Sequence, residues 1–484
     1  MPDTPLAFES ATTLVKKIKS KEISSRELTD MYIGRIEKYD PELNAVPVHN
    51  FERARAAADA ADAALAKGED LGPLHGIPMT IKEAYNVEGL PTTWGLPPFA
   101  DNIAQTDAQV VKRLKGAGAH FMGLSNVPAN LADFQSYNDI YGTTHNPWDL
   151  TRTPGGSSGG SAAALAAGLT ALESGSDIGG SIRNPAHYCG VYGHKPTWGI
   201  VPSQGHALPG MLASPDIAVL GPLARSAEDL ALSMDIVAGA DPMSSGGWTL
   251  TLPKPIKTKL SEFRVAIMPS DDMAPVSKAM SDRVQEIGEV LSKHGATVSD
   301  TARPQINMED AYRVYLYMLN AVTAAGFPQD EIDRRKKIVA DMDPNDQSIS
   351  ASMMRSTVQD HRDWLSYSNQ REHLRLAWRA FFEDWDILIC PQVATTAFPH
   401  DHTPFQDRML TVDNTEQKYF QQLFWAGFIT GSYLPSTVFP TGPARDGLPI
   451  GLQAVSTEFN DYTCIEFARL ITQEVGGFTP PPGY

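Results

Sequence analysis

The chain has 484 residues, of which 42% are hydrophobic, and its formal net charge is −17. This apolar content is sufficient for a large buried core and excludes a disordered chain. The acidic charge disfavours binding to nucleic acid or to an anionic membrane surface. No secretory leader opens the chain and no apolar run reaches the roughly 18–20 residues of a membrane helix. We therefore expect a cytoplasmic protein.

The first 70 residues are predicted to be helical. Ser24 and Glu27 have the spacing of a capping box, and an alanine-rich run over 56–67 predicts a second helix that ends at Gly68. An apolar strand then ends at Lys82. A helix over 108–115 and a strand over 121–124 follow it, so the order strand, helix, strand predicts a parallel βαβ unit.

The rest of the chain alternates loops, helices and short apolar runs. Residues 125–160 are rich in Asn, Pro and Gly and are predicted to be mostly loop. Helices are expected over 162–168, 281–294 and 370–385. Strands are expected over 387–390, 435–440 and 450–455, with a turn at 445–447 between the last two. No internal repeat or linker interrupts this pattern.

The cysteines and histidines give no metal or thiol motif. Cys189, Cys390 and Cys464 are far apart and form no CxxC pair, so we expect buried, reduced thiols. His400 and His402 lack a third ligand at metal-binding spacing, which favours a surface loop. His187 and His194 lie near the later glycine motif, but no Asp/His pairing supports a Ser–His or Cys–His site, so packing is expected.

The stretch TPGGSSGGS (153–161) is the most unusual segment of the sequence. It is not a P-loop, because no lysine follows its glycines as GxxxxGK[ST] requires. It matches GxSxG around Ser157 and Ser158, but a nucleophile elbow must follow a buried strand and residues 146–154 are a poor strand. Neither a nucleotide site nor an α/β-hydrolase site is favoured.

A second glycine–serine loop lies shortly downstream, at SGSDIGGSIR (174–183). Two glycines before Ser181 leave backbone N–H groups unobstructed, as an oxyanion hole requires. Upstream, Lys82 ends an apolar strand, and a desolvated lysine has a lowered pKa and can act as a base.

The sequence resembles the amidase signature family. The residues that carry the resemblance are HGIPMTIKEAYNVEGLPTTWG (75–95), PGGSSGGSAAALAAG (154–168) and SDIGGSIRNPAHYCGVYGHKPT (176–197), with GPLARS (221–226) and GLPIGLQAV (447–455) as later landmarks. The resemblance spans nearly the whole chain and is thin between about 230 and 385.

The resemblance implies an α/β fold with a single large mixed β-sheet flanked by helices on both faces. It implies one domain over 1–484, with a motif core at about 74–226. A variable, substrate-shaping segment is expected at about 228–385, and residues 386–484 are expected to complete the sheet.

By motif position, the resemblance also implies a Ser–cis-Ser–Lys triad. Ser181 would be the nucleophile, Ser157 the bridging serine in a cis peptide, and Lys82 the base. The remaining implied site residues fall into three groups: an oxyanion hole of the N–H groups of Ile178, Gly179, Gly180 and Ser181; supporting positions Gly156, Ser158, Asp177 and Arg183; and an acyl-side lining of Leu131, Ala132 and Asp133. Glu83 stands where the family commonly has aspartate, which affects local hydrogen bonding alone.

The implied reaction is hydrolysis of a carboxylic amide through an acyl-enzyme, and anilide, carbamate or ester bonds would react by the same route. No cofactor is implied, the partner is a small-molecule substrate, and a monomer or homodimer is expected. A glutaminase subunit of a tRNA-dependent amidotransferase is an alternative, but residues 201–222 lack that relative's Asp-Gln pair. A fatty-amide hydrolase is a second alternative, although no hydrophobic anchor helix is visible, and a non-catalytic scaffold is a third.

Overall fold

The computed structural model of the protein describes residues 4–484. The α-helices, in chain order, are α1 (Thr4–Ala7), α2 (Ala11–Lys19), α3 (Ser25–Leu43), α4 (Phe51–Ala66), α5 (Gln109–Gly116), α6 (Gly159–Ala166), α7 (Arg183–Cys189), α8 (Ala227–Val237), α9 (Lys278–Lys293), α10 (Met308–Thr323), α11 (Gln329–Ala340), α12 (Ile349–Ser356), α13 (His361–Asp384), α14 (Leu423–Gly431) and α15 (Asp461–Val475). The strands are β1 (Val48–His49), β2 (Pro78–Lys82), β3 (His120–Ser125), β4 (Tyr137–Asn138), β5 (Gly142–Thr143), β6 (Glu173–Asp177), β7 (Tyr192–Lys195), β8 (Val219–Ala224), β9 (Arg264–Ile267), β10 (Thr297–Ser299), β11 (Ile387–Pro391), β12 (Met409–Val412), β13 (Thr415–Lys418), β14 (Ser436–Pro443) and β15 (Pro449–Val455).

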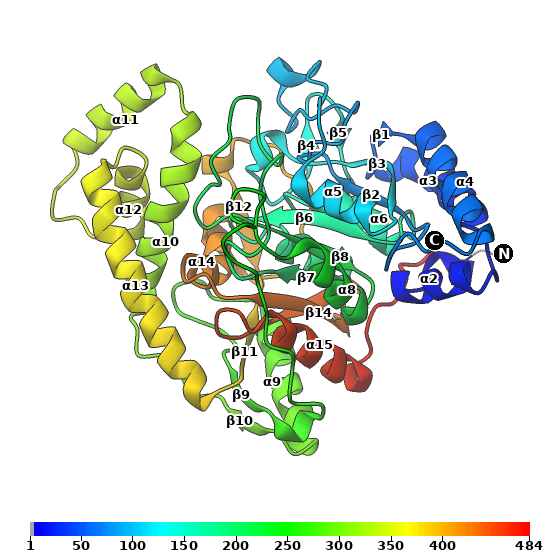
Figure 1. The fold of residues 1–484 in the computed structure, drawn as a ribbon. Helices are drawn as coiled ribbons and strands as arrows, with labels where there is room; N and C mark the ends of the chain where they lie inside the picture. Colours follow the sequence, from blue (N-terminus) through cyan, green and yellow to red (C-terminus); the bar gives the residue numbers. More distant parts are fainter. Residues whose placement is uncertain (1–3) are drawn as a thin grey trace.

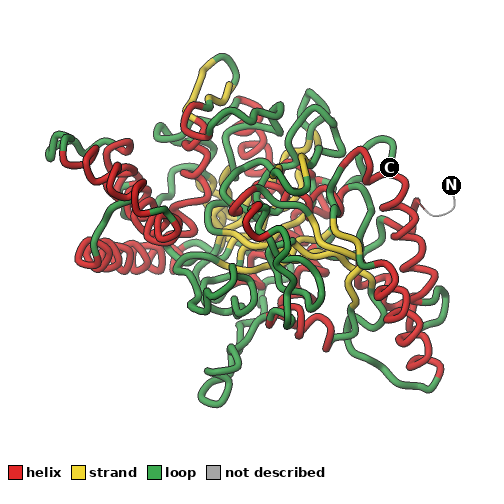
Figure 2. Tube along the Cα trace, turned by 90° about the horizontal axis from the view of Figure 1, so that it is seen from above, coloured by secondary structure: helices red, strands yellow, loops and turns green. Residues whose placement is uncertain are grey.

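An eight-stranded sheet in the order β10-β9-β11-β15-β14-β7-β8-β6 forms the centre of the molecule (Figure 1). The pairs β10–β9 and β9–β11 are parallel, and the pairs from β11 through to β6 are antiparallel. Viewed from above, the strands run as a layer through the middle with helices on both sides (Figure 2). The predicted α/β class, with a large mixed sheet between helices, is confirmed.

Alternating side chains of β14 show how the two faces of this sheet are covered. Phe439 faces α15, where its ring lies 6.3 Å from that of Phe467. The neighbouring Val438 points to the other face, toward α7. On that face α7 lies very close to β15, because a Cβ added to Gly451 would stand 3.0 Å from both the His187 Cα and a Val438 methyl. A glycine is therefore needed for the helix to approach the sheet.

The predicted βαβ unit is confirmed, and it stands in a sheet of its own. β2 and β3 pair in parallel, with Lys82 opposite Ser125, and β1 completes a three-stranded sheet in the order β1-β3-β2. The Thr80 hydroxyl of β2 donates a 2.5 Å hydrogen bond to Glu173 of β6. The small sheet thus meets the edge strand of the large one, which brings the end of β2 close to the residues that follow β6.

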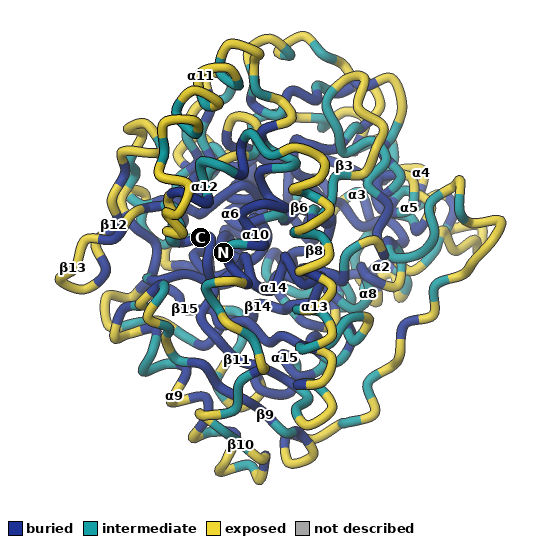
Figure 3. The backbone as a smooth tube through the Cα atoms, turned by 90° about the vertical axis from the view of Figure 1, so that its left-hand side faces the viewer, coloured by how far each residue is buried: buried dark blue, intermediate teal, exposed yellow. Residues whose placement is uncertain are grey.

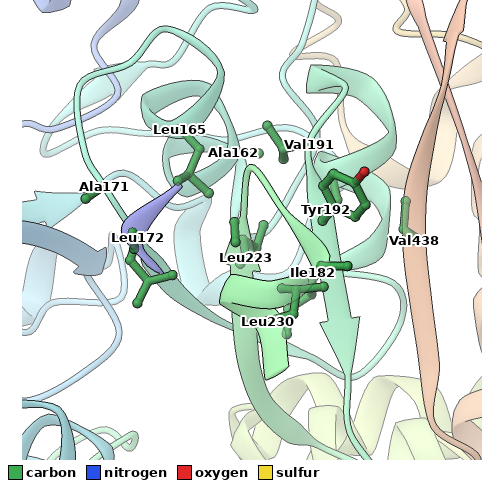
Figure 4. Packing of buried hydrophobic residues seen from close by; sticks show 14 of the residues in the cluster. Ala162, Leu165, Ala171, Leu172, Ile182, Val191, Tyr192, Leu223, Leu230 and Val438 are labelled. Atoms are coloured by element: carbon green, nitrogen blue, oxygen red, sulfur yellow. The ribbon is translucent and has the colours of Figure 1, made fainter. Parts of the chain in front are cut away.

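The core between these sheets is packed with small and branched side chains. Figure 4 shows Ala162 and Leu165 of α6 near Leu223 of β8, with Ile182 next to Leu223 and Val438 on a strand further to the right. All eight residues of α6 are buried. The sequence pattern placed the start of this helix at 162, and the structure begins it at Gly159, directly inside the glycine-rich loop.

A helical region formed by α10, α12 and α13, with α11 at its outer edge, lies to one side of the sheet (Figure 1). α10 supplies the buried face of this region, whereas α11 has no buried residue among its own. Figure 3 shows α13 running exposed across the surface. α13 begins at His361, well before the predicted 370, because Asp360 caps it through a capping box with Asp363.

Several further expectations are confirmed. The capping box of Ser24 and Glu27 opens α3, and the two strands expected on either side of the turn at 445–447 are β14 and β15, which pair antiparallel. Cys189, Cys390 and Cys464 are buried and free of disulfides. Within residues 4–484, no helix has both the length and the apolar character needed to span a membrane.

Candidate active site

Lys82, the last residue of β2, lies in a cluster of serine hydroxyls drawn from the glycine-rich loop and from strand β6. Its Nζ donates to Ser157 Oγ at 2.7 Å, to Ser158 Oγ at 2.9 Å and to Ser176 Oγ at 3.0 Å. The whole lysine side chain is buried. The structure therefore brings together the predicted base, the predicted bridging serine and the predicted supporting serine.

The burial of Lys82 changes its acidity. Desolvation lowers the pKa of Lys82 from 10.5 to about 7, and the negative charges of Asp177 and Glu173 offset this only in part. A substantial fraction of the lysine is therefore neutral near pH 7 and able to accept a proton. The three hydroxyl groups around Nζ satisfy its hydrogen bonds without supplying a counter-charge.

The glycine-rich loop places Ser157 beside this lysine. The peptide bond between Gly156 and Ser157 is cis. A Cβ on Gly156 would stand 2.4 Å from the Asp133 carbonyl oxygen, and one on Gly160 would stand 2.3 Å from the Asn126 nitrogen. The glycines of this loop thus allow backbone to pack directly against backbone, which no other residue could do.

Ser181 lies between β6 and α7, in the second predicted loop. Its carbonyl accepts a 3.0 Å hydrogen bond from the Ser158 N–H, which ties the two serine loops together. Ser181 is 8% exposed, whereas Ser157 and Lys82 are essentially sealed from solvent. The Ser181 hydroxyl has no hydrogen-bond partner in residues 4–484, so its side-chain link to Ser157 stays a prediction.

Asp177 and Arg183, the two charged residues among the predicted supporting positions, form an ion pair at this loop. The Arg183 guanidinium donates to both Asp177 oxygens, at 2.9 and 3.0 Å, and both side chains are fully buried. Asp177 also accepts the N–H groups of Gly180 at 2.8 Å and Ile182 at 3.1 Å. Burial by itself would raise the pKa of Asp177, but the charge and hydrogen bonds of Arg183, the charge of Lys195 and the Gly180 N–H together outweigh it and lower that pKa to about 2.

The predicted oxyanion donors differ in how they are used. Gly180 gives its N–H to Asp177, so this donor is already occupied. The N–H groups of Ile178, Gly179 and Ser181 have no acceptor within residues 4–484. Ile178 is half-buried, and its carbonyl accepts a 3.2 Å hydrogen bond from the Tyr315 hydroxyl of α10. Ile178, Gly179 and Ser181 therefore keep N–H donors that remain available for a ligand.

The predicted acyl-side residues lie around the single turn of 3-10 helix at 129–131. Leu131 has a positive φ of 56° and is half-buried, and Ala132 is exposed. The Asp133 carboxylate is engaged by the protein itself, accepting from Arg408 Nη1 at 2.6 Å and from the Tyr419 hydroxyl at 2.8 Å. Asp133 thus anchors the segment around 408–419 instead of offering a free carboxylate.

The histidines considered in the sequence are held by packing partners. His187 hydrogen-bonds with backbone at Gly451 and Thr395, and His194 lies between Thr437 and Asp461. His402 stacks on the ring of Tyr137 at 3.9 Å. In the described part of the chain, no three His, Cys, Asp or Glu residues are grouped so that they could hold a metal ion.

Two residues of the site were not identified from the sequence. Ser176 contributes the third hydroxyl to Lys82, and Glu173 is a fully buried acid whose pKa burial raises to about 7. Both lie on β6, the strand that leads directly into the loop of Ser181. Ser176 stands at the edge of the second glycine–serine motif and Glu173 lies just before it, but only the contact between β2 and β6 shows that they are neighbours of Lys82.

Comparison with known proteins defines the class to which this protein belongs. The Amidase family profile matches residues 27–465. An indoleacetamide hydrolase from Bradyrhizobium diazoefficiens is 33% identical over 98% of this chain and 88% of its own length. An acylamidase from Rhodococcus erythropolis is also 33% identical, over 95% of this chain and 94% of its own length. The matching relatives also include glutamyl-tRNA(Gln) amidotransferase A subunits and human fatty-acid amide hydrolase 2.

A solved structure of similar fold is a bacterial aryl acylamidase of the amidase signature family, with a TM-score of 0.80 and 24% identity over 97% of both chains. The fold and the site thus define an amidohydrolase that acts on carbon–nitrogen amide bonds. The chain belongs to the amidase signature family, as its glycine–serine motifs predict.

Proposed function

We propose that this amidase hydrolyses carboxylic amides of small molecules through an acyl-enzyme formed on Ser181. The Ser181 oxygen attacks the substrate carbonyl, and its proton passes through Ser157 to Lys82. The same proton is then delivered to the leaving amine as the carbon–nitrogen bond breaks, and water later releases the acid from Ser181. The observation that carries this proposal is the direct hydrogen bond from buried Lys82 to Ser157 Oγ at 2.7 Å.

The acidity of Lys82 supports this assignment of roles. A base must be partly unprotonated at working pH, and a pKa of about 7 meets that condition for Lys82. The free N–H groups of Gly179 and Ser181 would hold the oxyanion that develops during attack. Asp177 and Arg183 would keep these N–H groups in place, since they fix the intervening Gly180.

For the substrate we infer small aryl or alkyl amides, anilides and carbamates. The names of the relatives support the amide part of this inference, since they describe an indoleacetamide hydrolase and an acylamidase. We also infer that the segment at about 228–385 shapes the site. Tyr315 of α10 supports this, because its hydroxyl reaches the Ile178 carbonyl of the nucleophile loop.

The glutaminase subunit of a tRNA-dependent amidotransferase is the second candidate, because A subunits of that enzyme are among the relatives. Such a subunit would work in a complex, so copurification of the intact chain with partner subunits would favour it. Hydrolysis of anilides by this chain alone, as a monomer or homodimer, would favour the first candidate.

A fluorophosphonate probe, which labels activated serines covalently, tests the proposed nucleophile. Ser181→Ala should abolish both labelling and amide hydrolysis, measured by release of the amine. Ser158→Ala is the matched control, since this serine contacts Lys82 but is not assigned the attack. Labelling that persists in Ser181→Ala and disappears in Ser158→Ala would contradict the assignment.

A further inference from the structure

Gln392 follows β11 directly and is fully buried, yet its side-chain amide is unpaired. Neither Nε2 nor Oε1 has a hydrogen-bond partner in residues 4–484, and the residue has 0% exposure. A glutamine amide carries both donors and an acceptor, and buried polar groups of this kind are nearly always bonded. Leaving both ends unpaired destabilises the folded protein, which indicates that this side chain serves a purpose other than stability.

Gln453, in the neighbouring strand β15, shows what a structural glutamine looks like in the same region. It is equally buried, and its Nε2 donates to the carbonyls of Pro391 at 2.8 Å and Trp425 at 3.0 Å. Its Oε1 accepts from Arg183 at 3.2 Å and Ser436 at 2.9 Å. Every polar atom of Gln453 is satisfied within the protein, in contrast to Gln392.

The unpaired amide lies against the loop that carries Ser181. A Cβ added to Gly180 would stand 2.8 Å from Gln392 Nε2, so the amide occupies the space beside the residue that precedes Ser181. The free N–H groups of Gly179 and Ser181 belong to the same turn. Donors and an acceptor without protein partners are thus gathered around one short stretch of backbone.

We propose that Gln392 is a substrate-binding residue that hydrogen-bonds the amide group of the substrate. Its Oε1 accepts from the N–H on the leaving side, and its Nε2 donates to an oxygen of the same substrate. Substrates with an N–H at the scissile bond, namely amides, anilides and N–H carbamates, satisfy both ends of Gln392. Esters leave the Oε1 acceptor unpaired and are disfavoured for that reason. The inference rests on the proposed function of Ser181.

Gln392→Met tests this role, because methionine has a similar shape without the hydrogen-bonding groups. The substrates are an anilide and the phenyl ester of the same acid, so that the acyl group is constant. We expect kcat/KM for the anilide to fall about tenfold to hundredfold, as two lost hydrogen bonds would give, and kcat/KM for the ester, which bonds Nε2 alone, to fall by a smaller factor. The thermal unfolding midpoint should stay the same or rise, since an unpaired buried amide is removed.

Gln453→Met is the control with the opposite expectation. It removes a fully bonded glutamine, so the unfolding midpoint should fall and the two substrates should be affected in equal proportion. If Gln392→Met also affects the anilide and the ester equally, or affects neither, Gln392 is not a substrate-binding residue. Wild-type enzyme that cleaves neither substrate would overturn the proposed function itself, and a wild type that cleaves both isolates the role of Gln392.

Discussion

Two buried regions of this molecule are each centred on a lysine, and they differ in what surrounds the amine. Lys82 ends β2 of the small sheet, and Lys195 ends β7 of the large one. Both are fully buried, and desolvation lowers the pKa of each to about 7. Lys82 Nζ contacts three serine hydroxyls, whereas Lys195 Nζ donates to the Pro196 carbonyl at 2.9 Å.

The difference shows that a lowered pKa does not by itself identify a base. A carbonyl can accept a hydrogen bond but has no proton to give, so Lys195 has no route for proton transfer through Pro196. A serine hydroxyl both accepts and donates, so Lys82 can receive a proton through Ser157. The partners of the amine, and not its acidity, separate the proposed catalytic lysine from the structural one.

The largest expected effect comes from removing each amine in turn. Lys82→Met should lower kcat/KM for an anilide by about 10²- to 10⁴-fold, the usual contribution of a positioned base. Lys195→Met should retain fluorophosphonate labelling, with its main effect on the thermal unfolding midpoint. Comparable losses of labelling in the two variants would remove the distinction between the lysines.

The second effect concerns Asp177, whose charge raises the pKa of both lysines. Asp177→Asn leaves Arg183 buried without its counter-charge, which should lower the free energy of unfolding by about 3–5 kcal/mol. Denaturant titration measures this loss. Asp282→Asn breaks the exposed ion pair with Lys278 and should leave stability nearly unchanged. A stable Asp177→Asn protein with normal activity would show that the loop does not depend on this pair.

The third effect is the pH dependence of the wild type. Only neutral Lys82 accepts a proton, so kcat/KM should rise with pH, with a midpoint of about 7. Below that midpoint it should fall about tenfold per pH unit. Measuring kcat/KM for one anilide over a range of pH gives this rising limb of the pH profile. Lys195→Met should keep the same midpoint, and loss of the limb in that variant would assign it to Lys195.

The smallest effect is a shift of that midpoint. The Glu173 charge raises the pKa of Lys82, so Glu173→Gln should move the midpoint to lower pH, by less than about one unit because Glu173 itself titrates near 7. Asp461 acts on Lys195 instead, so Asp461→Asn should leave the midpoint in place. A midpoint that shifts in Asp461→Asn and not in Glu173→Gln would assign the base to Lys195 instead of Lys82.

Much of the fold was accessible from the sequence because its signals are local. The Ser24 and Glu27 capping box, the apolar run that ends at Lys82 and the turn at 445–447 each depend on residues close along the chain. Boundaries were less certain: α13 begins at His361 because Asp360 caps it, a weaker signal than the apolar pattern further along. The placement of β1, β2 and β3 in a separate sheet could not be predicted, since strand pairing depends on contacts between distant segments.

For the site, the sequence by itself determined membership of the amidase signature family, because the stretches around Lys82, Ser157 and Ser181 resemble its motifs. Only the tertiary structure decided how they are used. In the folded protein the Asp133 carboxylate accepts from Arg408, the Gly180 N–H donates to Asp177, and Ser176 accepts from Lys82. Among residues 4–484, the tertiary structure also left the Gln392 amide without a partner while satisfying that of Gln453. The physical reason is that hydrogen-bond partners and burial are properties of neighbours in space, which a one-dimensional pattern does not contain.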